Sequence, residues 1–246
     1  MPRARTQLAK LTAPQLHGAL ARTRLFSRLD EARGRPVICV MGPPGAGKTT
    51  LVATWLESRR KNAIWYQVDA GDADAASFFH YFGMAVATKR RTRLPAFGAE
   101  YRHDITSFAR RYFRALSDLL PANSIIVLDN LQDAGPAATL HRALVAAIAE
   151  LPRGANLLTI SREEYPEEFS RLVANRTISM IDWDDLRLTP LETREIVEAR
   201  HPSLKASAGT FHEQSQGWAA GLTLMLERAA HTHEVEAING ADTREE

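Results

Sequence analysis

The chain has 246 residues, of which 45% are hydrophobic and 24% charged, and its 31 Lys and Arg residues nearly balance 29 Asp and Glu residues, for a formal net charge of +2. This composition excludes an intrinsically disordered chain and is sufficient for one large core or two smaller ones. So small a net charge does not favour binding of nucleic acid by the chain as a whole.

The number of cysteines and the hydropathy of the sequence indicate the cellular compartment of the protein. The single cysteine, Cys39, excludes an internal disulfide and a cysteine-based zinc site, which indicates a reducing compartment. No segment approaches the roughly 20 apolar residues that a membrane-spanning helix needs. We therefore expect a cytoplasmic protein without a membrane partner.

Short apolar runs alternate along the chain with longer helical patterns, which predicts an α/β fold with a parallel β-sheet flanked by helices. The apolar runs are nearly continuous, as in strands that are covered on both faces. The predicted strands are Pro36–Met41, Ala63–Val68, Ser124–Leu128, Asn156–Ile160 and Thr177–Ile181, and the predicted helices are Lys48–Arg59, Ala75–Lys89, Ile105–Leu120 and Leu140–Glu150.

The sequence changes character near Asp184–Leu188. Beyond it, Thr189-Pro190-Leu191-Glu192 predicts a capping box with proline at the first helical position, and only helical patterns follow. The polar residues 231–246 lack periodicity and predict a flexible tail or the start of a linker. The predicted organisation is an N-terminal extension (1–19), an α/β domain (20–186) that contains the glycine-rich segment 42–49, a small helical domain (187–230) and the tail (231–246).

The nucleotide assignment rests on the segment Gly42-Pro43-Pro44-Gly45-Ala46-Gly47-Lys48-Thr49, a full match to the phosphate-binding loop motif between a predicted strand and a predicted helix. Its glycines let successive N–H groups point at phosphates at the positive end of a helix dipole. We expect Lys48 to reach the β- and γ-phosphates and Thr49 to bind Mg²⁺, with Thr50 and the loop completing a site for ATP or ADP.

A carboxylate on a second strand should complete the magnesium site, and Asp129 follows the apolar run Ser124–Leu128. The next residue, Asn130, can orient a water molecule but cannot accept its proton, so slow hydrolysis is expected. Asp69 and Asp133 could serve as the missing base, or they could simply be strand-end or cap residues.

Arg162 follows the fourth predicted strand and could contact the γ-phosphate as a sensor. The alternative is an exposed arginine that pairs with Glu163, Glu164 or Glu167. The basic run Lys89–Arg93 predicts a solvated loop rather than a patch for a partner or nucleic acid.

Tryptophan side chains can serve as core residues or as ligand contacts. We expect Trp55 and Trp65 to pack between the predicted helix Lys48–Arg59 and the predicted strand Ala63–Val68. Trp218 could pack near the base of a nucleotide, but its helical spacing with Leu222, Leu224 and Leu226 favours a core position.

Together, the ordered motifs resemble the STAND-class P-loop ATPases, and within them the MalT-like and large LuxR-type transcriptional regulators. They cover roughly residues 20–226: RTRL (22–25), GPPGAGKTT (42–50), IWYQVDAGDADAASFF (64–79), IIVLDN (125–130), LLTISR (157–162), RLVANR (171–176), WDDLRLTPLE (183–192) and GWAAGL (217–222). The fold implied is a P-loop NTPase of the ASCE type followed by a small all-helical lid domain.

The resemblance implies a switch that ADP holds closed and monomeric and that ATP with an inducer opens for self-association. It implies phosphate and magnesium roles for Lys48, Thr49, Asp129 and Arg162, places Arg22 or Arg24 in the segment that borders the nucleotide, and assigns DNA binding to a module absent from this chain.

Two departures from the family pattern matter. Asn130 replaces the second acid of the Walker B strand, and Ala219 replaces the proline expected near the adenine. The function expected is an ATP/ADP-binding regulatory switch with slow ATPase activity. The alternatives are a P-loop kinase or phosphotransferase and a nucleotide-binding scaffold that does not hydrolyse.

Overall fold

The computed structural model describes residues 9–16, 18–89, 94–135 and 138–242. These residues fall into two compact units, one drawn from Met1–Gly42 and Lys48–Asp182 and the other from Pro43–Gly47 and Trp183–Glu246. The domain boundaries expected from the sequence remain a prediction. The basic segment 90–93 lies outside the described residues.

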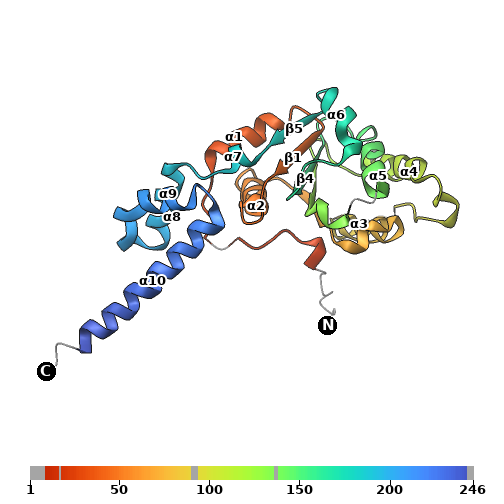
Figure 1. Ribbon diagram of the computed structural model, residues 1–246. Helices are drawn as coiled ribbons and strands as arrows, with labels where there is room; N and C mark the ends of the chain where they lie inside the picture. The colour runs from red at the N-terminus through yellow and green to blue at the C-terminus, as the bar shows by residue number, and fades with distance from the viewer. Residues whose placement is uncertain (1–8, 17, 90–93, 136–137, 243–246) are drawn as a thin grey trace. The chain divides into compact units, whose positions relative to one another are not determined.

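The first unit is built on a five-stranded parallel sheet in the order β2-β3-β4-β1-β5, of which β4, β1 and β5 are labelled in Figure 1. The strands are β1 (Val37–Met41), β2 (Ala63–Gln67), β3 (Ile125–Asp129), β4 (Asn156–Ser161) and β5 (Ile178–Ile181). Each lies within one residue of its predicted run. β4 separates β1 from β3, so the P-loop strand and the Asp129 strand are not direct neighbours.

Helices of the first unit cover the sheet. The α-helices are α1 (Thr23–Ala32), α2 (Lys48–Ser58), α3 (Ala75–Lys89), α4 (Ile105–Ser117), α5 (Ala138–Ile148) and α6 (Ser170–Ala174). Short 3₁₀ helices connect them: η1 (Ala9–Leu11), η2 (Ala70–Ala73), η3 (Ala99–Tyr101), η4 (Leu131–Ala134) and η5 (Glu167–Phe169). The predicted helices correspond to α2, α3, α4 and α5, whereas α1 and α6 were not predicted.

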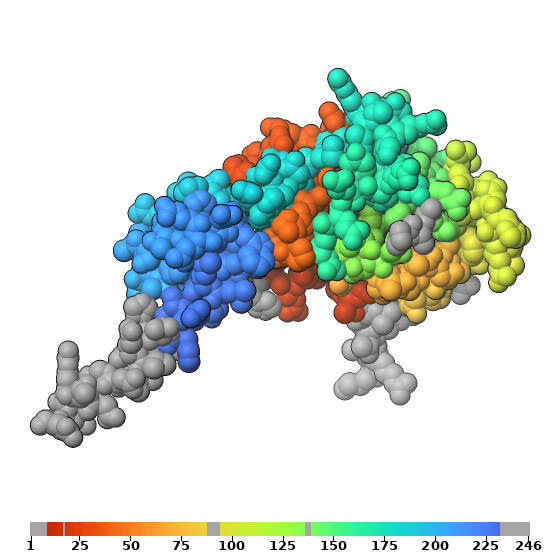
Figure 2. Space-filling view, in the orientation of Figure 1, coloured from red at the N-terminus to blue at the C-terminus, as the bar shows by residue number. Residues whose placement is uncertain are grey.

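One large apolar core joins the sheet to α3, α4 and α5, which lie side by side on the surface in Figure 2. Alternate strand residues supply it, including Val37 and Cys39 of β1 and Tyr66 of β2. Their neighbours Ile38 and Val40 are also fully buried. The strands are therefore covered on both faces, which explains their nearly continuous apolar sequences.

The second unit contains α7 (Trp183–Leu186), α8 (Pro190–Arg200), η6 (Pro202–Ser207), α9 (Ala208–Ser215) and α10 (Ala219–Asp242), and its described residues form helices and turns without a strand. The predicted capping box starts α8: Glu192 N–H donates to Thr189 Oγ1 at 3.2 Å, and Thr189 N–H donates to Glu192 Oε2 at 2.9 Å. Leu188, Val197 and Leu222 share a small core.

α10 continues to Asp242 and therefore extends into the region where the sequence predicted a tail from residue 231. The apolar pattern ends near Ala230, but good helix formers such as Ala and Glu follow it, and a helix that has already formed adds residues at little cost. Within the described residues, no helix combines the length and apolar character that a membrane crossing requires.

Candidate functional site

The P-loop joins β1 to α2, as the motif predicted. Gly45 and Gly47 have φ values of 73° and 82°, a left-handed conformation that glycine adopts without a steric cost. The turn is closed by Ala46 N–H, which donates to Pro43 O at 3.2 Å. Left-handed residues in such a turn bring successive N–H groups onto one side of the loop, which is the arrangement that binds phosphate.

Lys48 is the first residue of α2 and folds back over the start of the loop. Its Nζ donates to Gly42 O at 2.5 Å, and the residue is buried. Burial lowers the pKa of Lys48, the charge of Arg162 lowers it further, and Asp129 opposes both effects. A desolvated ammonium group in this position gains strongly from contact with phosphate oxygens.

Thr49 and Asp129 meet although 80 positions separate them in the sequence. Thr49 Oγ1 donates to Asp129 Oδ1 at 3.0 Å, and Asp129 is only 4% exposed. Burial raises the pKa of Asp129, against the lowering effects of the Thr49 hydroxyl and the Asn130 backbone N–H. The buried Asp129 carboxylate lies beside the hydroxyl oxygen of Thr49. A cation bound between these oxygens would offset the free-energy cost of burying the carboxylate charge.

These two residues fit Mg²⁺, which prefers one or two protein oxygens plus water and phosphate oxygens. Thr49 and Asp129 would hold the ion, which would neutralise charge on the phosphates. The described residues contain no cluster of three or more His, Cys, Asp or Glu side chains that could hold a metal alone.

Asn130 follows Asp129 at φ 60° and ψ 45°, a left-handed conformation that asparagine tolerates better than most residues. This turn starts η4 and directs the chain toward Asp133. The geometry explains why a short polar residue suits the position. The slow hydrolysis expected from Asn130 remains a prediction.

Arg162 lies just beyond β4, which is adjacent to β1 as expected. Its Nη2 pairs with Asp133 Oδ1 at 2.9 Å, and its backbone N–H donates to the side chain of Gln132 at 3.0 Å. The partner is thus Asp133 and not one of the nearby residues Glu163, Glu164 or Glu167, because η4 brings Asp133 alongside the end of β4. The charge of Arg162 acts on Lys48, and its role as a phosphate sensor remains a prediction.

Gln132 is a site residue that the sequence analysis missed. Its amide oxygen accepts from Arg162 N–H, and its amide nitrogen donates to Asp133 Oδ1 at 2.9 Å. It thereby fixes both members of the ion pair. The available signal was its position three residues after Asp129, on the turn that leaves the Walker B strand.

The other predicted candidates have different surroundings. Asp69 caps η2 by accepting from Gly71 N–H at 2.9 Å, so the structure favours its interpretation as a cap. Arg22 is buried at the N-cap position of α1, and Arg24 is exposed in the first turn of that helix. Their place beside a nucleotide remains a prediction.

The structure agrees with the predictions for two of the tryptophans and contradicts the prediction for the third. Trp55 and Trp65 are buried as expected. The core position favoured for Trp218 is wrong: this side chain is 38% exposed, and its Nε1 donates to Pro44 O at 2.9 Å. Ala219 packs against the small core of the second unit.

Replacing Asp129 by asparagine is expected to reduce the stimulation of nucleotide binding by Mg²⁺ about tenfold or more, because an amide is a weaker ligand than a carboxylate. Fluorescent-nucleotide titrations with Mg²⁺ and with EDTA would measure the effect. Asp133→Asn is the matched control and should retain the stimulation, since Asp133 is paired with Arg162. The reverse pattern would assign the metal to Asp133.

The same substitution has a consequence for stability. The pKa of Asp129 is raised in the folded protein, so its ionisation costs stability as the pH rises from the unfolded-state pKa through the folded one. At neutral pH, Asp129→Asn should therefore melt at the same temperature as the wild type or higher. This separates lost metal binding from unfolding.

Comparison with known proteins agrees with this geometry. The family model described as the AAA ATPase domain matches residues 19–160. The HTH-type transcriptional regulator MalT of Vibrio cholerae is 26% identical over 235 residues, which cover 92% of this chain and 25% of that protein. The chain thus spans a quarter of the length of this curated relative.

Two solved structures share the fold. The Walker-type ATPase PABY2304 of Pyrococcus abyssi superposes with a TM-score of 0.55 at 13% identity, covering 92% of this chain and 77% of that one. The Aeropyrum pernix ORC1 protein, solved in complex with DNA, gives a TM-score of 0.53 at 17% identity, covering 89% of this chain and 62% of that one. The sheet, the P-loop and the matched family model lead to one conclusion: the chain belongs to the AAA ATPase domain family and is similar to part of the HTH-type transcriptional regulator MalT.

Proposed function

We propose that the chain is an ATP/ADP-binding switch with slow ATPase activity, in a signal-transducing regulator of the STAND type. The observation that carries this proposal is the 3.0 Å contact between Thr49 and Asp129, which unites a P-loop hydroxyl with a buried carboxylate from a different strand. Lys48 lies at the same loop with a lowered pKa caused mainly by burial. Together they supply the charges that a Mg²⁺–nucleotide complex requires.

The regulatory part of the proposal rests on the similarity to MalT, whose name describes a helix-turn-helix transcriptional regulator. The nucleotide state would bias a conformational equilibrium, because ATP and ADP differ by one phosphate group and can therefore bind two arrangements unequally. ATP would promote self-association in the cytoplasm. DNA would be bound by a module outside this sequence, in keeping with the net charge of +2.

A second candidate, a nucleotide-binding scaffold that does not hydrolyse, is favoured by Asn130. Its amide replaces the acid that would accept a proton from the attacking water. Nucleotide binding would be the same in both candidates. Only turnover separates them.

The test is single-turnover hydrolysis of Mg·ATP by the wild type, Lys48→Ala and Asp129→Ala. The switch predicts turnover well below the enzyme median of about 10 s⁻¹, with a further loss of about 100-fold in either variant. Wild-type turnover no faster than that of Lys48→Ala would instead establish the scaffold.

Sedimentation velocity addresses the switch directly. The wild type should form larger species with Mg·ATP than with Mg·ADP, and the Asp129→Ala variant should lose this difference. Identical sedimentation in both nucleotides at saturating concentration, with nucleotide binding intact, would contradict a self-associating switch.

A further inference from the structure

The carbonyl side of the P-loop is occupied by residues from the start of α10. A loop that turns its N–H groups toward phosphates leaves carbonyl groups on its other side. Pro44 O accepts from the indole Nε1 of Trp218 at 2.9 Å, and Gly45 O accepts from the backbone N–H of Ala220 at 3.0 Å. All four residues belong to one compact unit.

Small residues make this approach possible. A Cβ added to Gly45 would lie 2.4 Å from the Cβ of Ala220, so this glycine is required by the contact as well as by its left-handed φ. A Cβ on Gly221 would lie 2.7 Å from the Trp218 ring. Gly221 therefore leaves room for the indole to turn toward the loop.

Gly217 sets the entry into α10. Its φ is 77°, and an added Cβ would lie 2.8 Å from Leu188 O. Its own carbonyl accepts from Leu188 N–H at 2.9 Å. The Gly-Trp-Ala-Ala-Gly sequence is thus explained by the geometry of a connection that presents one indole N–H and one helix-terminal N–H to the loop.

We propose that Trp218 is a positioning residue for the P-loop: with the Ala220 amide it clamps the carbonyl side of the loop, so that phosphate binding and the seating of α10 on the loop stabilise each other. The inference rests on the proposed nucleotide binding and adds the element that transmits it. Because coupling between two equilibria is reciprocal, whatever loosens the clamp weakens phosphate binding, and phosphate binding tightens the clamp. Trp218 acts here through the loop backbone, by its hydrogen bond to Pro44 O.

The first test compares Trp218→Phe, which keeps an aromatic ring but removes the N–H donor, with Trp183→Phe as a matched control in the same unit. Trp183 stacks against Arg187. Loss of the hydrogen bond should raise the Kd for Mg·ADP about three- to tenfold, the effect of one hydrogen bond. The control should bind within twofold of the wild type.

A second measurement, amide hydrogen exchange of the peptide covering residues 217–226, reports on the clamp itself. In the wild type, Mg·ADP should slow exchange here, because the Ala220 N–H bond to Gly45 O becomes more persistent. In Trp218→Phe, Mg·ADP should slow the amide exchange of this peptide less than it does in the wild type. A residue that only supports folding would lower the melting temperature and leave this nucleotide dependence unchanged.

The outcomes are distinguishable. An unchanged Kd in Trp218→Phe, or exchange of residues 217–226 that is insensitive to Mg·ADP, would overturn the clamp while leaving nucleotide binding intact. Failure of the wild type to bind Mg·ADP or Mg·ATP would overturn the proposed function and the clamp together.

Discussion

Replacing Lys48 by alanine is expected to raise the Kd for Mg·ATP about 100- to 10,000-fold, since two charge-assisted hydrogen bonds to phosphate at about 1.5–3 kcal/mol each would be lost. The ammonium group is buried and folded over Gly42 at the first turn of α2. Water cannot replace it at that position without leaving phosphate charge unpaired. Isothermal calorimetry or a fluorescent-nucleotide titration would give the Kd.

The matched control is Lys205→Ala, which removes the same charge from a surface pair with Glu198. Its Kd should equal that of the wild type. Burial lowers the pKa of Lys48, so keeping its charge in the folded protein costs stability, and Lys48→Ala should not melt earlier than the wild type. Wild-type affinity in Lys48→Ala would exclude this loop as the phosphate site.

Much of this fold is predictable because the strands are buried on both faces. Each of the five apolar runs corresponds to a strand, and the P-loop lies between β1 and α2 as its motif requires. α1 was missed, although its buried Leu25 and Leu29 are at helical spacing, because the short segment carried no recognised N-cap. Its Arg22 N-cap makes no side-chain capping hydrogen bond.

The site was less predictable where its contacts join distant positions. Thr49 and Asp129 follow from the known roles of their motifs, but the pairing of Arg162 with Asp133 depends on how η4 turns toward β4. From the sequence, the expected partners of Arg162 were its close neighbours in the chain, Glu163, Glu164 and Glu167. Trp218 was misassigned because helical periodicity identifies a face of a helix but cannot reveal a hydrogen-bond acceptor 174 positions away.

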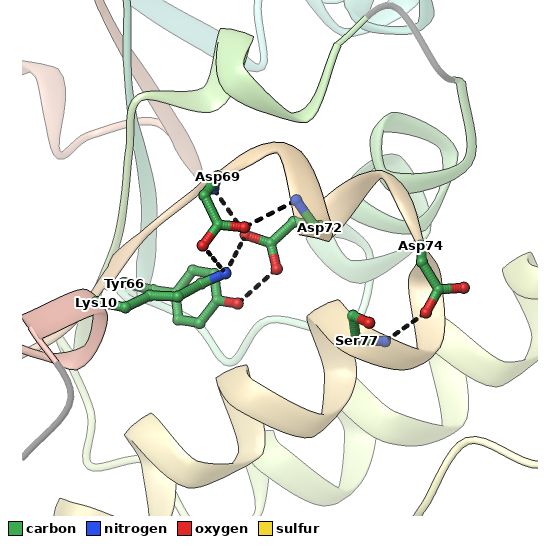
Figure 3. A network of polar contacts seen from close by, with 7 residues as sticks. Lys10, Tyr66, Asp69, Asp72, Asp74 and Ser77 are labelled. Carbon is green, nitrogen blue, oxygen red and sulfur yellow. Dashed lines mark hydrogen bonds and ion pairs between the residues drawn. The ribbon is translucent and has the colours of Figure 1, made fainter.

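An ionic network at the end of β2, centred on the buried Asp72, should contribute strongly to stability (Figure 3). Asp72 is fully buried, and its carboxylate accepts from the Tyr66 hydroxyl at 2.7 Å and from Asp69 N–H at 2.9 Å. Lys10 Nζ lies 2.7 Å from both Asp69 and Asp72. Burial, then the hydrogen bond to Asp72, raises the pKa of Tyr66, so the phenol remains a donor.

Lys10→Met is expected to destabilise the protein by about 3–5 kcal/mol, because it leaves the Asp72 carboxylate buried without its counter-charge. A chain of this size loses about 2–4 °C per kcal/mol, so the melting temperature should fall by roughly 10 °C. Urea unfolding followed by circular dichroism would measure the free energy. Asp72→Asn alone should also be strongly destabilising.

The double variant Lys10→Met/Asp72→Asn separates the ion pair from general packing. It should lose less stability than the two single variants added together, since removing both charges leaves neither one unpaired. Asp74→Ala is the control within the same segment: Asp74 is exposed and accepts from Ser77 N–H at 2.9 Å, so its loss should cost about 1 kcal/mol, as for a helix cap. If the losses in the free energy of unfolding of the two single variants were strictly additive, Lys10 and Asp72 would not depend on each other. The N-terminal segment would then stabilise the protein only through its apolar contacts, such as that of Leu11 with the core.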